Sequence, residues 1–518
     1  MEQRKLIVLG LDGADWKILE PLMAEGALPN LKRMMDGGSH ARLQSTCPPL
    51  TAPSWTTIFT GVNPGKHGIY DFWFLGKGGI HHNTSRDIQV PYLWEIMAGR
   101  KIIAFNIPFM YPPRGGLNSA VVSGFNTPSA ASQFTLPKEL REEILSMAPD
   151  YDFSIGKAGK LLQAGASSDM SSLNNIIMRN LANKKKVAKH LLSTRPWELA
   201  IVVFSATDWA QHFFMHEFLN AEKKSPTMVG MVYSSIDSFV AEFLANDYDV
   251  IVVSDHGFRE VRRHLYLNEY LKRQGHLVLK ADPPIRRISR ALGITAERVM
   301  PFLPHSIIEF FWYNKAAAKL AKSLVPIRMS VFDNIDYEKS MVLLGNCNGS
   351  IYLQKDFPLG KATEILGGCR DAAGRPAFTR ILTKKESYGE NAIGMPPSLN
   401  VTPQEDIFLK IEVGGPVWEE IDPKREKNGG HAEFGVFMAY GNGFMAKGRM
   451  QDLAVAGITP TVLAYFGHPV PSYMDGTPIG ILKKMPPAAM LSLKEKTRLS
   501  AKIVAARVAS AAASQVKH

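Results

Sequence analysis

The sequence predicts an α/β fold in which a mostly parallel central sheet carries helices on both faces. Three short apolar runs, at 6–11, 199–204 and 250–253, each lead to a polar residue, as strands buried on both faces of a parallel sheet do. Helix-like segments lie between them, among which are 29–35 and 168–194. This alternation is typical of an open sheet covered by helices.

The chain is long enough for more than one folding unit, since 518 residues exceed one simple domain. Residues 1–270 and 426–485 carry the α/β pattern and are expected to form one core that holds the candidate metal ligands. Between them, prolines interrupt a basic, helix-rich stretch that gives way to short strand-like runs. We therefore expect 271–425 to be an inserted α+β cap, and 486–518 to be a basic C-terminal tail.

The composition is that of a globular protein, with 45% hydrophobic and 21% charged residues. The formal net charge is +12, and two stretches, 286–322 and 483–518, concentrate it. A solvated basic surface explains this charge, and a weak peripheral site for anionic membrane or a polyanionic substrate is the alternative. The sequence contains no zinc-finger, RNP or P-loop pattern, which argues against a dedicated nucleic-acid module.

Three cysteines, Cys47, Cys347 and Cys369, show no CxxC spacing, so a thiolate zinc site is not expected. So few cysteines suit a reducing cytoplasm. The apolar run at 6–10 is too short for a signal peptide and has no small-residue cleavage site after it. There is also no run of about 18 apolar residues. We expect a cytoplasmic protein without a transmembrane helix.

Acidic residues lie at or near the ends of the three predicted strands: Asp12, Asp208 and Asp255. Ligands of open α/β sheets bind at the carboxyl ends of the strands. A carboxylate at the end of a buried strand is costly unless it is paired or binds a metal. A helix-capping role for Asp12 is the alternative reading.

Histidines accompany two of these acids. Asp208 and His212 are four residues apart, so on a helix they share one face, and His216 continues the stripe. This spacing suits two ligands of one metal, although polar residues on a helix surface have the same spacing. His256 directly follows Asp255, where Gly257 would let the chain bend so that both side chains turn toward one site.

A further histidine, His431, follows Gly429-Gly430 and precedes another predicted strand; on its own it is typical of a loop. The combined set has the mixed oxygen and nitrogen ligands of two zinc-like sites. Its six members are Asp12, Asp208, His212, Asp255, His256 and His431.

One hydroxyl completes the candidate site. Pro53 fixes φ for a first helical turn, so Thr51 would lie just before a helix N-terminus. The free N–H groups and the helix dipole favour negative charge there, which can hold an alkoxide and stabilise a bound phosphate. An ordinary threonine N-cap is the alternative.

Six sequence blocks between residues 11 and 479 resemble, in order, those of the alkaline-phosphatase superfamily. They are most similar to the branch of type I phosphodiesterases and nucleotide pyrophosphatases, which implies an alkaline-phosphatase-like fold. The blocks are LDGADW, TAPSWTTIFTGVNPGKHGIYDF, TDWAQH, SDHGF, NGGHAEFGV and ITPTVLAYFGHPVPSYMDGTPI.

The resemblance implies two divalent metal ions and a phosphate-ester small molecule as substrate. Zinc is the favoured metal, and manganese is the alternative. One metal would be held by Asp208, His212 and His431. The other would be held by Asp12, Asp255, His256 and the nucleophile Thr51. Thr51 would attack phosphorus to form a phospho-threonine, which water then hydrolyses. Phosphodiester or nucleotide-pyrophosphate cleavage is favoured over monoester hydrolysis.

Two departures from that branch affect the expected substrate contacts. Phe72 follows Asp71, where the pyrophosphatases have an asparagine that binds a phosphate oxygen. The pair at 54–55 is Ser-Trp, where Asn-His is usual. With these contacts to the substrate absent, Lys66 or His67 is a candidate to supply a positive charge in their place.

Other functions within the superfamily stay open: phosphomonoesterase, phosphomutase or phosphotransferase. A sulfatase is disfavoured because Thr51 cannot give the formylglycine aldehyde and Trp55 stands where its motif has arginine. A catalytically inactive binding protein is disfavoured because all seven expected groups are present. Residues 271–425 contain no motif that identifies the substrate.

Overall fold

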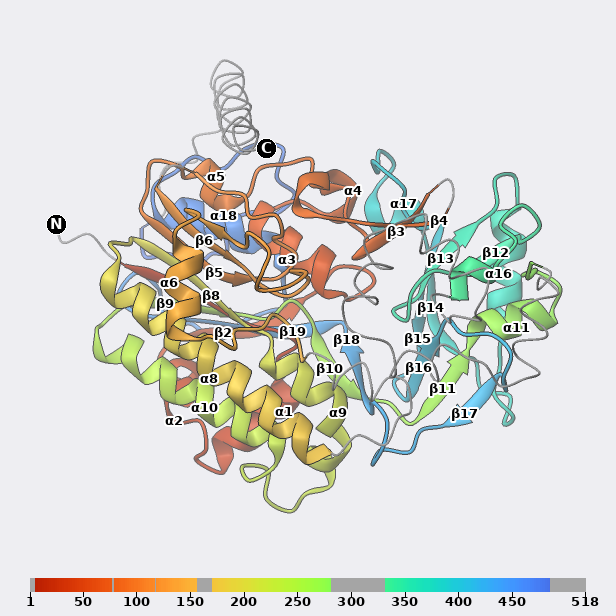
Figure 1. Ribbon diagram of the computed structural model, residues 1–518, viewed down its shortest axis with the longest axis horizontal. Coiled ribbons are helices and arrows are strands. Elements are labelled where there is room, and N and C mark those ends of the chain that lie inside the picture. The colour runs from red at the N-terminus through yellow and green to blue at the C-terminus, as the bar shows by residue number, and fades with distance from the viewer. Residues whose placement is uncertain (1–4, 77–78, 117, 156–169, 281–330, 485–518) are drawn as a thin grey trace.

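The computed structural model describes residues 5–484 apart from 77–78, 117, 156–169 and 281–330 (Figure 1). The basic stretch 286–322 and the predicted tail 486–518 therefore lie outside the described residues.

A ten-stranded sheet forms the centre of the larger part of the molecule, with the order β20-β2-β19-β9-β1-β8-β5-β6-β7 and β21 beside β2. β1 is parallel to β8 and β9, and β5 is parallel to β8 and β6, whereas β19 is antiparallel to both neighbours. The predicted fold class is confirmed. The strands are β1 (Leu6–Leu11), β2 (Ser39–Gln44), β5 (Ile102–Ile107), β6 (Ser119–Ser123), β7 (Thr135–Leu136), β8 (Leu199–Phe204), β9 (Asp249–Val253), β19 (Phe434–Tyr440), β20 (Gly448–Arg449) and β21 (Leu453–Ala454).

Each face of this sheet packs against its own hydrophobic core, because successive side chains of a strand point to opposite faces. In β1, Ile7 and Leu9 belong to one core, and Leu6 and Val8 to the other. The first core is covered by α1 (Trp16–Ala24), α2 (Pro29–Gly37), α6 (Leu140–Met147), α8 (Met170–Thr194), α9 (Ala206–Asn220) and α10 (Met228–Ala245). The second is covered by α3 (Thr51–Thr60), α5 (Leu93–Ile96) and α18 (Ile458–Tyr465) (Figure 1).

Among the described helices, α10 alone is long and apolar enough by length and composition to span a membrane. It packs against α9, α2 and α8 in the first core, and most of it is buried. This burial accounts for its apolar sequence.

A third core belongs to the smaller part at the right of Figure 1. Two sheets build it, with strand orders β16-β11-β17 and β12-β13-β15-β14. Their strands are β11 (Arg263–Tyr266), β12 (Val342–Leu344), β13 (Ser350–Leu353), β14 (Phe378–Thr383), β15 (Leu399–Pro403), β16 (Ile407–Lys410) and β17 (Trp418–Glu420). The helices are α11 (Leu267–Arg273), α16 (Leu359–Gly367) and α17 (Lys384–Tyr388). We call this part the cap.

Two short strand pairs lie between the large sheet and the cap. β10 (Gly257–Glu260) pairs antiparallel with β18 (Gly429–Ala432), and β3 (Trp73–Gly76) pairs with β4 (Gly79–His82). The first pair directly follows β9 and directly precedes β19, so it joins the carboxyl end of the sheet to the cap (Figure 1).

Candidate metal centre

Asp12 lies at the carboxyl end of β1, where Gly13 reverses the chain with φ +70°. Thr207 Oγ1 donates to the Asp12 carbonyl at 2.6 Å, and Gly13 N donates to Asp255 Oδ1 at 3.1 Å. These bonds tie the ends of β1, β8 and β9 together. A Cβ at Gly13 would come 2.7 Å from the ring of Phe258, so the turn has room only for glycine.

Thr51 is the first residue of α3, one position inside the helix rather than just before it, with the extended Leu50 as N-cap. Its hydroxyl does not cap the helix; Oγ1 lies 3.4 Å from His256 Nε2. Ser54 Oγ donates to the Asp255 carbonyl at 2.6 Å, which fixes the first turn of α3 against the end of β9. Trp55 is buried and stacks on Phe59, so residues 54 and 55 hold the helix in place.

Asp255 and His256 are fully buried directly after β9. Gly257, expected to provide a bend there, instead begins β10 with an ordinary φ. Any side chain on it would collide with the backbone, since a Cβ would lie 2.0 Å from the Phe434 carbonyl oxygen. Close approach of two backbones therefore explains the glycine.

Each of the three candidate histidines has Nδ1 beside a backbone carbonyl oxygen. His212 pairs with Gly429 O at 2.9 Å, His256 with Gly257 O at 3.1 Å, and His431 with Pro49 O at 3.1 Å. A carbonyl only accepts, so Nδ1 carries the proton in every case and Nε2 keeps its lone pair. A hydrogen bond from Nδ1 to a carbonyl oxygen orients the ring of a metal-binding histidine.

The Nε2 atoms and three carboxylates converge on one small volume. Asp208 Oδ1 lies 3.5 Å from His212 Nε2 and 3.4 Å from His431 Nε2. His256 Nε2 lies 3.2 Å from Asp255 Oδ2 and 3.8 Å from Asp12 Oδ1. The rings of His256 and His431 stack with centroids 3.7 Å apart, so the two groups adjoin.

Two sets of ligand atoms lie close enough to hold a metal, Asp208 with His256 and His431, and Asp12 with Asp255 and His256. The structure thus brings together all seven residues that the sequence singled out. His216, the next residue of the α9 stripe, instead pairs with Glu260 at 2.6 Å.

The inward carboxylate oxygens support cation binding. Asp12 Oδ1, Asp208 Oδ1 and Asp255 Oδ2 are buried and have no hydrogen-bond partner. Burial raises the pKa of Asp12 well above its usual range, and the charges of Asp255 and Asp208 raise it further. Burial likewise raises the pKa of Asp255. Unpartnered buried oxygens are rare and costly, and a divalent cation would satisfy them.

The protonation states of the histidines also support cation binding. Burial lowers the pKa of His212 to about 3, and it lowers that of His256 well below its usual range. Both imidazoles are therefore neutral at pH 7, which is the form that binds metal. Carboxylate oxygen and imidazole nitrogen together suit zinc and manganese.

The two candidates for an extra positive charge differ in their surroundings. His67 is fully buried, burial lowers its pKa to about 3, and its Nε2 lies 3.1 Å from Thr57 Oγ1. Lys66 Nζ forms an ion pair with Asp475 at 2.5 Å. The expectation is wrong for His67, which burial keeps neutral, and it stays a prediction for Lys66, whose ammonium group has a counterion in this structure.

Two features near the centre were not predicted from the sequence. Phe72 packs edge-to-face on Phe109 and Phe125, and Phe125 in turn meets Trp209, the neighbour of Asp208. This aromatic row includes the position at which Phe72 departs from the asparagine of the pyrophosphatases. Periodicity gives no signal for it, since its members come from separate loops and one helix.

The second feature links the large sheet to the cap. Asn346 Nδ2, in the loop between β12 and β13, donates to Asp71 Oδ2 at 2.7 Å. Burial raises the pKa of Asp71 to about 7. The two residues are 275 positions apart, so only the folded chain reveals the contact.

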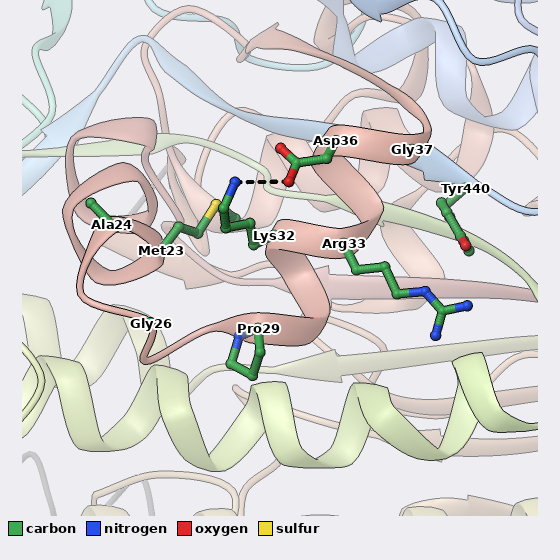
Figure 2. Close-up of a pocket in the computed structure, with 9 residues that line it drawn as sticks. All are labelled: Met23, Ala24, Gly26, Pro29, Lys32, Arg33, Asp36, Gly37 and Tyr440. Carbon is green, nitrogen blue, oxygen red and sulfur yellow. Dashed lines mark hydrogen bonds and ion pairs between the residues drawn. The ribbon is translucent and has the colours of Figure 1, made fainter.

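A surface hollow between α1 and α2 is separate from this centre (Figure 2). Its lining includes Lys32, which pairs with Asp36 at 2.7 Å, and Arg33, whose guanidinium lies 5.9 Å from the centroid of the Tyr440 ring. None of the seven candidate residues lines it.

The fold and the convergence of acids and histidines at the strand ends define a protein of the alkaline-phosphatase superfamily. The model of the type I phosphodiesterase / nucleotide pyrophosphatase family matches residues 6–308, more than half of the chain. The chain belongs to this family.

Two solved structures are similar in fold. Phosphonoacetate hydrolase from Sinorhizobium meliloti 1021, in complex with phosphonoformate, is 14% identical with a TM-score of 0.50, over 84% of this chain and 90% of that one. An inactive variant of murine ectonucleotide pyrophosphatase / phosphodiesterase 5, in complex with AMP, is 13% identical with a TM-score of 0.50, over 90% of this chain and 95% of that one. No curated protein matches the sequence.

Proposed function

We propose that this protein is a two-metal hydrolase that cleaves phosphodiester or nucleotide-pyrophosphate bonds through a phospho-threonine intermediate. The observation that carries the proposal is that lone-pair Nε2 atoms and unpartnered carboxylate oxygens converge, and that one of these atoms, His256 Nε2, lies 3.4 Å from Thr51 Oγ1. Membership of the family supports hydrolysis of phosphate esters.

The residues divide into two metal-binding groups. Asp208, His212 and His431 would hold one ion, and Asp12, Asp255, His256 and Thr51 would hold the other. Bound divalent ions would lower the pKa of a hydroxyl and neutralise the charge that develops on oxygen.

Thr51 Oγ1 then has two roles in succession. As nucleophile it gives its proton to solvent and forms a bond to phosphorus while the bond to the leaving oxygen breaks. As leaving group it departs when water attacks the phospho-threonine, which restores the hydroxyl. The free backbone N–H groups at the N-terminus of α3, which begins with Thr51, would stabilise the oxygens of the transferred group.

The ion pairs made by the basic residues nearest to Thr51 in the sequence support a diester over a monoester. A diester has one negative charge at phosphorus, whereas a monoester has up to two and needs more cationic contacts. Arg42, the nearest arginine in the sequence, is paired with Asp452 at 2.5 Å, and Lys66 is paired with Asp475. The aromatic row at Phe72 supports an apolar or aromatic group on the substrate.

The test compares bis-p-nitrophenyl phosphate with p-nitrophenyl phosphate, each with zinc and with manganese. We expect kcat/KM to be higher for the diester. A monoester preference of about tenfold, or about 1.4 kcal/mol of transition-state binding, would overturn the proposal in favour of a phosphatase or phosphomutase.

A further inference from the structure

Helix α9 carries two of the candidate metal ligands, and it is not one regular helix. Phe214 has φ −121° and ψ 15°, so the helix is broken two residues after His212. Sharp breaks of this kind arise at proline, at a bulge, or where a side chain inserts into the ladder of backbone hydrogen bonds. The sequence of α9 contains no proline, and an inserted side chain comes from another part of the chain.

Asn428, the first residue of the NGGHAEFGV block, is the residue that inserts. Its backbone N donates to the His212 carbonyl at 2.9 Å, and its Oδ1 accepts from His216 N at 2.9 Å. In a regular α-helix, the N–H of His216 would donate to the carbonyl of His212. Asn428 therefore bonds to both groups of one helical hydrogen bond. Its Nδ2 also donates to the next carbonyl, that of Phe213, at 2.7 Å.

Every polar atom of Asn428 has a partner. The residue is 1% exposed, and its Nδ2 makes a second bond, to the Pro423 carbonyl at 3.0 Å. Its own carbonyl accepts from Val261 N at 2.9 Å, directly beyond the end of the β10–β18 pair. A buried amide with all of its groups engaged specifies one arrangement of the segments around it. Aspartate has the same shape but no N–H donor, and leucine has neither donor nor acceptor.

The residues after Asn428 lie against the same helix, and α9 packs beside β18 (Figure 1). The Gly429 carbonyl accepts from His212 Nδ1 at 2.9 Å, and His431 Nε2 lies 3.3 Å from His212 Nε2. A Cβ on Gly429 would lie 2.1 Å from the Gln211 carbonyl oxygen, so the two backbones are in close contact. Asn428 is thus the point at which β18, which carries His431, is bound to α9.

The break in α9 also separates His216 from the rest of its stripe. On an unbroken helix, His216 would share a face with Asp208 and His212. It pairs instead with Glu260 of β10, with Nδ1 2.6 Å from Oε1. The break at Phe214 lies between the two histidines of the helix, which accounts for their different partners.

We propose that Asn428 is a positioning residue for the first metal site, that of Asp208, His212 and His431. By inserting into α9 it sets the distance between the Nε2 atoms of His212 and His431. This inference rests on the proposed function and adds a residue that acts through the ligands, without touching metal or substrate. Loss of its side chain should weaken the first site and leave the second site, at the end of β9, unchanged.

Zinc calorimetry on the full chain tests this with N428A and the matched control N268A. Asn268 is also a buried asparagine whose side chain bonds to backbone, to Leu344 N and to two carbonyls, but it lies in the cap. We expect N428A to weaken one of two zinc sites about tenfold or more, and N268A to leave both unchanged. N428D keeps the acceptor for His216 N but lacks the donors, so it should show the same loss and replaces N428A if the alanine variant does not fold.

Unchanged affinity at both sites in N428A and N428D would overturn the inference. An equal loss at both sites would overturn it too, because a general loss of stability does not select one site. Absence of zinc binding in the wild-type protein would overturn the proposed function instead.

A crystal structure of metal-free N428A, or of N428D, gives a readout that depends on neither zinc nor turnover. We expect Phe214 to adopt helical φ and ψ, and the Nε2 atoms of His212 and His431 to lie farther apart than 3.3 Å. A break retained at Phe214, with that distance unchanged, would overturn the inference and leave the proposed function intact.

Discussion

Thr51 Oγ1 lies 3.4 Å from His256 Nε2, although the two residues are 205 positions apart. The Nδ1 atom of His256 donates a hydrogen bond to the Gly257 carbonyl, so the lone pair is on Nε2, the atom that faces the hydroxyl. The hydroxyl belongs to the first residue of a helix that is fixed to Asp255 through Ser54. Nucleophile and ligands are therefore positioned by the same strand end.

Replacing Thr51 by alanine should abolish turnover and leave the fold intact. The hydroxyl makes no helix-capping bond, so its loss should change Tm by no more than about 2 °C. We expect kcat to fall by about a thousandfold or more, since the variant cannot form the phospho-threonine intermediate. The matched variant T51S keeps a hydroxyl and should retain measurable activity. An unchanged rate in T51A would show that another nucleophile attacks phosphorus.

The stabilising effect of metal should grow with pH. Burial raises the pKa values of Asp12 and Asp255, so both side chains favour the protonated form in the metal-free fold. Their contribution to the stability of the metal-free protein is complete below the usual pKa of an aspartic acid and is lost as the pH rises through the raised values. A bound cation needs the ionised carboxylates and offsets the free-energy cost of ionising them in the buried site.

Thermal unfolding with and without manganese at pH 6 and pH 8 measures this effect. We expect the metal-induced rise in Tm to be larger at pH 8, and the difference to shrink in D12N. A rise that is equal or larger at pH 6 would show that these carboxylates are not the metal ligands.

Gly13→Ala should weaken metal binding beyond the cost of its backbone strain. Gly13 and Gly26 have φ of +70° and +75°, but a Cβ at Gly13 would meet Phe258 at 2.7 Å, whereas nothing lies within 4 Å of one at Gly26. Gly26→Ala should therefore cost about 1 kcal/mol in urea unfolding and leave metal affinity unchanged. Gly13→Ala should cost more and also weaken metal binding. If both variants lose the same free energy of unfolding and keep the same metal affinity, the turn after Asp12 accommodates a side chain without moving the carboxylate.

Asn346→Ala should destabilise the contact between the cap and the large sheet. The Asn346 amide donates to Asp71 and to Ser350 Oγ, and its oxygen accepts from two backbone N–H groups. Losing these buried bonds should cost about 2 kcal/mol or more in urea unfolding. Asn348→Ala is the control, because only the backbone N–H of Asn348 takes part in this loop. Similar losses in both variants would mean that the loop, and not the Asp71 contact, sets the stability.

The sequence predicted the strands and the candidate ligands because both signals are local. Asp12 and Asp255 follow buried apolar runs, and the topology of a parallel sheet brings such strand ends together. The spacing of Asp208 and His212 needs only a helix. The resemblance to a known superfamily joined these local signals to Thr51 and His431.

Contacts that depend on long-range packing were beyond sequence reasoning. Burial makes His67 neutral, and Lys66 forms an ion pair with Asp475. Neither environment can be predicted from the residues adjacent in the sequence. The Asp71–Asn346 bond needs the cap to fold against the large sheet.

Anomalous diffraction from crystals soaked in zinc would locate the two metal ions that the proposed hydrolysis requires. We expect two peaks about 4 Å apart. One should lie among Asp208, His212 and His431, and the other among Asp12, Asp255, His256 and Thr51. A single peak, or zinc bound away from these side chains, would rule out the two-metal centre.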